Sequence, residues 1–225
     1  MEVVEVREHP HETSILNRYY MIKDPHGVNN FPELSGSPGV QDPASVVTES
    51  NLCDLTDNNL QGTDAAAKVL DRACLDDPDK KGWLIRLVGK DPNDPTNVAL
   101  RSPGEKTVTG ATTLGGTVIF ATNTPKQAVL ASGQCTGSLG TALIYAVSFR
   151  DATATIDFNG DGVVSQSEQF TQRVGGGFPP TPIPFATCIG PKCYEGAITG
   201  TDVVQPPTLA IGQRYRVFWN LSVDN

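Results

Sequence analysis

Two stretches of sequence decide the fold: GGTVIFATNT, residues 115–124, and TALIYAVSF, residues 141–149. Both are short and rich in β-branched and aromatic residues, which is typical of β-strands. GWLIRLV, residues 82–88, and EKTVTGATTL, residues 105–114, show the same composition, and a Gly-Gly turn joins the last of these to the first stretch. The sequence therefore predicts a mostly β protein.

The pattern of strands and turns continues toward both ends of the chain. A long loop rich in Pro, Gly and Asn is expected at residues 25–45. Between residues 172 and 188, four prolines restrict any strand to an edge or to part of its length. Further strands are predicted at EVVEVRE (2–8), NRYYMIKD (17–24), SVVTESNL (45–52, leading into a turn) and QRYRVFWNLSV (213–223).

One helix is predicted at TDAAAKVLDRACL, residues 63–75, with Thr63 or Asp64 as its N-cap and Pro78 forbidding its continuation. The order of predicted elements in the middle of the chain is a strand, a Gly-Gly turn, the strand VIFAT, a loop and the strand ALIYAVSF. This order is typical of propeller blades. We therefore expect residues 1–225 to form one domain, a partial β-propeller of several antiparallel blades. A β-sandwich is the alternative, because its strands are equally short.

Composition excludes some classes of function. The formal net charge is −8, and no basic stripe alternates with aromatic residues, so nucleic acid is not an expected partner. No window of 18 apolar residues occurs, so no membrane-spanning segment is expected. The first fifteen residues lack the features of a secretory signal, which leaves a cytoplasmic protein or a piece of a longer secreted one.

The five cysteines bear on that choice of compartment. Cys188 and Cys193 flank a Gly-Pro turn and can close a small disulfide loop, and Cys53 and Cys74 bracket a polar segment in a similar way. Cys135 is left over by this pairing. Zinc-like spacing is absent. Disulfides, and hence an oxidising compartment, are favoured over free buried thiols.

The segment DFNGDGVVSQSE, residues 157–168, matches a twelve-residue calcium loop at each diagnostic position. Calcium is a hard cation that takes six to eight oxygen ligands, and this pattern supplies them. A solvated Asp/Asn/Gly turn is the less favoured interpretation. Gly162 stands at the sharp sixth position, and the predicted ligands are Asp157, Asn159, Asp161, the carbonyl of Val163, Ser165 and Glu168.

The flanks of this loop argue against a calcium sensor. A strand precedes it, and only a helical stub, QSEQFTQR at residues 166–173, follows. A helix-opening switch needs a helix on each side. We therefore expect the ion to pin a loop between strands, with a dissociation constant of about 10⁻⁵ to 10⁻³ M in an extracellular setting.

Other candidate sites are weaker. His9, His11 and His26 are interpreted as surface residues, since no third ligand is placed by spacing. The acidic residues of DDPD, 76–79, are interpreted as solvated. No nucleophile motif, phosphate-binding loop or HExxH motif occurs, so no enzymatic activity is expected.

The order of several motifs resembles the C-terminal propeller region of the PilY family, the type IV pilus biogenesis factors that also serve as pilus-tip adhesins. The resemblance covers most of the chain. It is carried by NRYYMIKD (17–24), VVTESNLCDLTDN (46–58), KKGWLIRL (80–87), PGEKTVTGATTLGGTVIFATNTP (103–125), QCTGSLGTALIYAVSF (134–149), RVGGGFPPTPIPF (173–185) and GQRYRVFWN (212–220).

This resemblance implies an extracytoplasmic protein, in the periplasm, at the outer membrane surface or at the pilus tip. Family members favour pilus assembly by opposing retraction, and some attach to host or abiotic surfaces. Many bind calcium in this region, for which Asp157, Asn159, Asp161 and Glu168 are the matching residues. The expected partners are minor pilins or a chain that supplies the remaining blades.

The family's N-terminal adhesion module is missing from this sequence, and 225 residues supply too few blades for a complete propeller. We therefore expect the C-terminal part of a longer or split protein. The alternative functions are a carbohydrate-binding or scaffolding β module that uses calcium for rigidity and, less favoured, a propeller enzyme such as a quinoprotein dehydrogenase.

Overall fold

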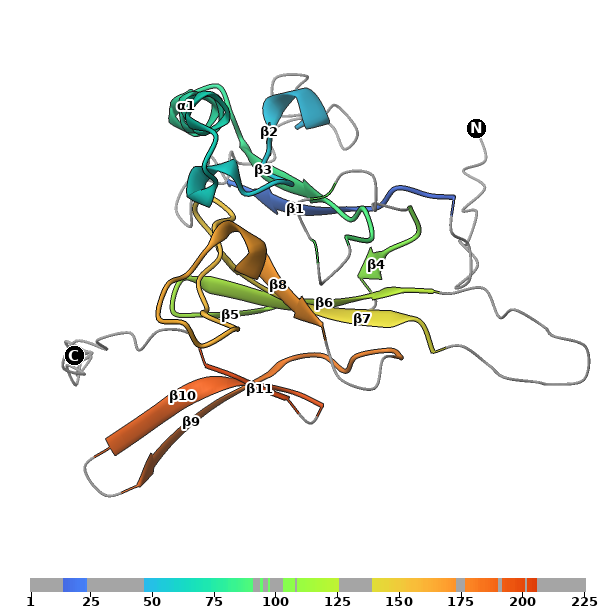
Figure 1. Ribbon diagram of the computed structural model, residues 1–225, viewed down its shortest axis with the longest axis vertical. Coiled ribbons are helices and arrows are strands. Elements are labelled where there is room, and N and C mark those ends of the chain that lie inside the picture. The colour runs from blue at the N-terminus through green and yellow to red at the C-terminus, as the bar shows by residue number, and fades with distance from the viewer. Residues whose placement is uncertain are drawn as a thin grey trace, which may run out of the picture.

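A computed structural model gives the fold of the chain. Within the described residues, the strands form three sheets, and one α-helix lies beside the first of them (Figure 1). The prediction of a mostly β chain is confirmed. The described residues are 14–23, 47–90, 94, 97, 103–107, 109–125, 139–172, 177–189, 192–200 and 202–205.

Several predicted features fall outside these ranges. They include two of the predicted strands, the long loop, all three histidines and the odd cysteine. In residue numbers, they are 2–8, 25–45, 213–223, His9, His11, His26 and Cys135.

The central sheet is built on the antiparallel pair of β6 (Thr117–Thr124) and β7 (Thr141–Ser148). On the other side of β6 lie β4 (Lys106–Thr107) and β5 (Thr112–Leu114), and on the other side of β7 lies β8 (Phe170–Gln172). The predicted Gly-Gly turn joins β5 to β6. Both of its glycines have a positive φ, which glycine adopts without steric cost.

The first outer sheet is centred on β3 (Gly82–Arg86). It pairs antiparallel with β1 (Arg18–Ile22) on one side and parallel with β2 (Cys53–Asp54) on the other. Tyr19 of β1 stacks on Phe120 of β6, with ring centroids 3.9 Å apart and planes inclined by only 2°. Aromatic packing thus joins this sheet to the central one.

The second outer sheet has the order β11–β10–β9, with β9 spanning Ile183–Ile189, β10 Lys192–Thr199 and β11 Asp202–Val204. As the prolines of this stretch predict, β9 is an edge strand. The β9–β10 hairpin extends away from the central sheet (Figure 1), and the side chain of Ile189 is 71 % exposed.

The β6–β7 pair is buried on both faces. On one face, Phe120 and Tyr145 join a core cluster with the fully buried Trp83 of β3. On the opposite face, Ile119 and Ile144 pack in a second cluster with residues of β10 and β11. This two-sided burial explains why both strands are continuous apolar runs, since alternation is needed only where one face meets water.

The predicted helix is present as α1 (Ala65–Asp76). Its N-cap is Asp64, whose carboxylate accepts hydrogen bonds from the backbone N–H groups of Ala66 and Ala67 at 2.9 and 3.2 Å. The helix ends two residues before Pro78, as the fixed ring geometry of proline requires. Both predicted helix boundaries are therefore confirmed within two residues.

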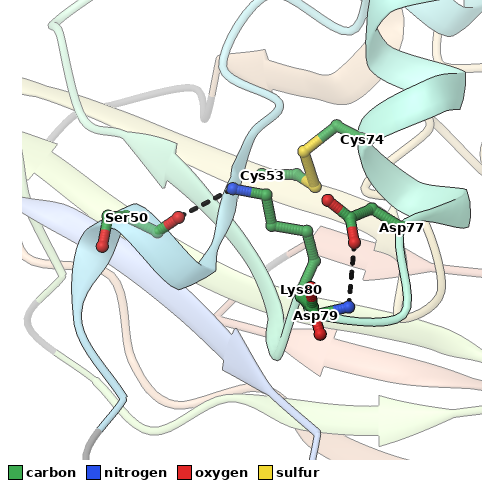
Figure 2. Close-up of a disulfide and its surroundings, with 6 residues drawn as sticks. All are labelled: Ser50, Cys53, Cys74, Asp77, Asp79 and Lys80. Atoms are coloured by element: carbon green, nitrogen blue, oxygen red, sulfur yellow. Dashed lines mark hydrogen bonds between the residues drawn. A yellow bond between two sulfur atoms is a disulfide. The ribbon is translucent and has the colours of Figure 1, made fainter.

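A disulfide joins Cys53 in β2 to Cys74 in the last turn of α1, with their Cα atoms 5.9 Å apart (Figure 2). This confirms one predicted pairing and fastens the helix to the first outer sheet. The second predicted pairing stays a prediction. The register of β9 and β10 sets its two residues, Cys188 and Cys193, opposite each other.

Two of the predicted strands come out differently. The strand predicted at 105–114 divides into β4 and β5, because four residues separate Thr107 from Thr112 whereas only two separate their partners Thr122 and Ile119. Of the strand and turn predicted at 45–52, the described residues 47–52 show the turn, a 3-10 turn at Glu49–Asn51, and no strand, because local side-chain hydrogen bonds replace the ladder. Among the described residues no sheet closes into a propeller or barrel, and the partial propeller stays a prediction.

Two-sided burial of β6 predicts that adjacent residues are equally sensitive to truncation. Ile119→Ala and Phe120→Ala should each lower the free energy of unfolding by about 2–5 kcal/mol, since each leaves a cavity in a different core cluster. Denaturant unfolding measures both. Val69→Ala, at a helix position that is 66 % exposed, is the control and should change stability by less than about 0.5 kcal/mol. An insensitive Ile119 would contradict burial by β10 and β11.

Candidate metal site

The segment Asp157–Glu168 connects the central strand β7 to β8. Before it, the chain turns back so that Ala154 forms a bridge with Val147 of β7. The last three residues of the segment lie in a single 3-10 turn, η5 (Gln166–Gln169), which replaces most of the predicted helical stub. β8 then pairs with β7 again. Both ends of the segment are therefore held by the same strand.

The carboxylate of Asp157 organises the first half of the loop. Its Oδ1 accepts a hydrogen bond from the backbone N–H of Gly160 at 2.6 Å, and its Oδ2 accepts one from Gly162 at 2.7 Å. These bonds, with Gly162 the largest cause, lower the pKa of Asp157 below its usual value of 3.8. Gly162 has φ of +86°, so the sharp turn predicted at the sixth position is confirmed.

The next two predicted ligands repeat this arrangement. Asn159 Oδ1 accepts from the N–H of Asp161 at 2.8 Å, and Asp161 Oδ1 accepts from the N–H of Val163 at 2.8 Å. Each side chain thus closes a local turn onto the residue two positions ahead. The Asn159 amide nitrogen also donates to Asp161 Oδ2 at 3.2 Å, which holds the two side chains together.

Glu168 closes the loop at its far end. Its side chain is only 4 % exposed. Oε1 accepts from the N–H groups of Phe158 and Asn159 at 2.9 and 3.1 Å, and Oε2 accepts from the N–H and hydroxyl of Ser165 at 2.8 and 2.9 Å. Four donors satisfy this buried carboxylate, which therefore ties the start of the loop to its end.

The charge of the loop is uncompensated within the part of the chain that the structure describes. Asp157, Asp161 and Glu168 form no ion pair there, whereas Arg18 and Arg86 are paired elsewhere, with Glu49 and Asp54. Three carboxylates within twelve residues favour a cation. All predicted ligands are oxygen atoms, which suit calcium better than zinc.

The described residues contain no group of three or more His, Cys, Asp or Glu side chains already gathered as a metal centre. The predicted ligands also include groups of other kinds, namely the amide of Asn159, the hydroxyl of Ser165 and the carbonyl of Val163. A carboxylate has about four lone-pair positions. The two donors to Asp157 leave some of its positions free, whereas the four donors to Glu168 match all of its positions, so Glu168 would exchange hydrogen bonds for the ion. The donor set therefore fits calcium chemically, although its ligands are turned partly toward the backbone.

Sequence reasoning missed the side chains that surround the loop. Gln61 exchanges two hydrogen bonds with the backbone of Ala154, and Gln166 and Gln169 extend to segments far away in sequence. No local sequence pattern predicts that these glutamines contact residues so far away in the chain. Only the folded chain reveals them.

A second buried polar cluster lies between the first outer sheet and the central one. The fully buried Glu105 accepts hydrogen bonds from Gly89 N–H, Thr122 Oγ1 and Tyr145 Oη at 2.7–2.8 Å. Burial, followed by the charge of Glu105, raises the pKa of Tyr145 well above 10.0. Glu105 is satisfied by three donors, and we interpret the cluster as structural.

Comparison of the chain with protein-family models, with curated proteins and with solved structures gives no match. Among the described helices, none is long and apolar enough to cross a membrane.

The lowered pKa of Asp157 predicts a pH effect with a definite sign. A carboxylate whose pKa falls on folding stabilises the fold above about pH 3.8, and this contribution is lost as pH falls through the folded-state pKa. Titration of the Asp157 carboxyl carbon by NMR, in calcium-free buffer, should give a midpoint below that of the same residue in urea. Equal midpoints would contradict the hydrogen bonds from Gly160 and Gly162.

Proposed function

We propose that the chain binds one calcium ion in the loop Asp157–Glu168. The supporting observation is the buried Glu168, which hydrogen-bonds both ends of the loop and so brings first and last ligands together. The bound ion would offset two of the three carboxylate charges. The proposed ligands are Asp157, Asn159, Asp161, the carbonyl of Val163, Ser165 and Glu168.

The proposed role of the ion is structural. Both flanks of the loop are fixed to β7, and the loop runs into the single 3-10 turn η5, which leads directly to β8. A helix-opening sensor needs two movable helices, which this arrangement does not supply. Calcium would therefore fix a connection between neighbouring strands of the central sheet.

We further propose that the chain is a structural and adhesive component of a type IV pilus, acting as an assembly factor that opposes retraction. The order of motifs that resembles the PilY family supports this, together with the predicted calcium loop. The Cys53–Cys74 disulfide favours an oxidising compartment, which agrees with a location in the periplasm, at the outer membrane surface or at the pilus tip.

The proposed architecture is a partial propeller whose remaining blades come from another chain or from more of the same protein. The stack of a central sheet between two outer sheets supports this proposal (Figure 1). Minor pilins are the proposed partners. A calcium-stabilised carbohydrate-binding module is the main alternative, and a glycan array separates the two, since selective sugar binding is not expected of an assembly factor.

Removal of two loop carboxylates should abolish calcium binding without unfolding the sheets. We expect Asp157→Asn/Glu168→Gln to eliminate the calcium heat in calorimetry. In the wild type, calcium at 100 times its dissociation constant should raise the free energy of unfolding by about 2.7 kcal/mol. Asp76→Asn/Asp79→Asn is the matched control, because it removes the same charge at exposed positions far from the loop. Calcium heat that survives in the loop variant would contradict the site.

The pilus proposal predicts a phenotype in the organism that encodes the chain. Deletion of the gene should reduce the number of surface pili, and blocking retraction should restore it, because the proposed role is to oppose retraction. Electron microscopy counts the pili. Unchanged pili after deletion would contradict this role while leaving the calcium site untouched.

A further inference from the structure

The turn that carries Glu168 is held by a segment more than 100 positions earlier in the chain. Gln166 Nε2 donates to the carbonyl of Asp57 at 2.7 Å, and Asn58 Nδ2 donates to the carbonyl of Gln166 at 3.3 Å. In the first bond Gln166 is the donor, and in the second it is the acceptor. They fix both the side chain and the backbone of Gln166.

The same early segment also holds the chain just before the loop. The amide of Gln61 accepts from the N–H of Ala154 at 2.7 Å and donates to its carbonyl at 3.1 Å, as a partner strand would. Asn58 Nδ2 donates to Gln61 Oε1 at 2.7 Å and so joins the two sets of contacts. We call Asp57–Gln61 the bracket, since it hydrogen-bonds Ala154 before the loop and Gln166 near the end of the loop.

On the other side of Glu168, Gln169 is almost completely buried, at 1 % exposure. Its Nε2 donates to the carbonyl of Ala152 at 3.0 Å, and its Oε1 accepts from Lys90 Nζ at 3.3 Å. Glu168 is therefore flanked by two glutamines, both fixed by tertiary hydrogen bonds.

The bracket is itself anchored to the first outer sheet. Leu55, just before it, is 1 % exposed and donates its N–H to the carbonyl of Leu84 at 2.9 Å. Two residues earlier stands Cys53, whose disulfide to Cys74 secures the start of this segment (Figure 2). A continuous path of covalent and hydrogen bonds thus runs from the disulfide to η5.

The turn η5 needs such support. It has only four residues, and Glu168 within it has φ −97° and ψ 15°, outside helical values. Short 3-10 turns make poor hydrogen bonds of their own, so their geometry depends on packing and external partners.

We propose that the bracket positions Glu168 for calcium, so that calcium affinity depends on Gln166 and on the Cys53–Cys74 disulfide. This proposal rests on the proposed calcium site. Partners that orient a metal ligand typically account for about 10- to 100-fold in affinity. Because coupling is reciprocal, calcium in turn stabilises the disulfide-bonded segment against reduction.

Gln166→Ala tests the positioning role. We expect it to weaken calcium binding by about 10-fold in calorimetry, with the denaturant midpoint of the calcium-free protein changed little. Gln205→Ala is the matched control, because Gln205 is exposed and remote in sequence. Gly62→Ala is an independent variant, since its new Cβ would lie 2.9 Å from Gln166 Oε1 and displace that amide. Unchanged affinity in both Gln166→Ala and Gly62→Ala would overturn the proposal.

A double-mutant cycle tests whether the disulfide and Gln166 act on calcium affinity through the same contacts. Cys53→Ser/Cys74→Ser should weaken calcium binding, and its effect should shrink when Gln166→Ala is also present, because both changes act through the bracket. Fully additive losses would overturn the path from the disulfide to η5.

Hydrogen exchange separates this proposal from the calcium site itself. In calcium-free protein, Gln166→Ala should speed exchange of the N–H groups of Phe158, Asn159 and Ser165, which donate to Glu168. If the wild type binds no calcium, the proposed function fails and this exchange decides whether the bracket positions Glu168. Unchanged exchange, with or without calcium binding, would overturn the bracket.

Discussion

The central constraint in this chain is the burial of β6 and β7 on both faces. The pair can be stable only if a separate layer covers each face, because an exposed run such as Val-Ile-Phe-Ala would be costly in water. The first outer sheet supplies Trp83 and Tyr19 on one side, and β10 and β11 supply Ala197 and Val204 on the other. The two outer sheets are placed by their packing against these two strands.

The candidate metal site follows from the same constraint. Since β7 is fixed in the core, the chain that leaves it and the chain that returns as β8 start from fixed points. The loop between them carries its charge at the rim of a rigid sheet. Such a support suits a site that maintains shape, because ligands held at both ends have little freedom to rearrange.

Much of this could be predicted from local sequence. The strands 115–124 and 141–149, the cap at Asp64 and the turn at Gly162 each depend on neighbouring residues, and their patterns identify them. The pairing of Cys53 with Cys74 depends on a helix that local pattern also predicts.

The rest depends on contacts that no local pattern records. The interruption between β4 and β5 arises from a mismatch in length against β6, and the 3-10 turn at Glu49–Asn51 arises from competing side-chain hydrogen bonds. The buried Glu105 and Gln169 look like surface residues in the sequence. Their burial is stable because hydrogen bonds to partners from other segments offset the desolvation of their polar groups.

The position of the Cys53–Cys74 bond also has a consequence for biogenesis. The two cysteines are 21 residues apart, and both precede the central strands. When a polypeptide crosses a membrane from its N-terminus, an oxidase can join them before residues 115–149 have emerged. If the chain is exported as proposed, the disulfide can therefore form before the central strands have emerged to pack against the first outer sheet.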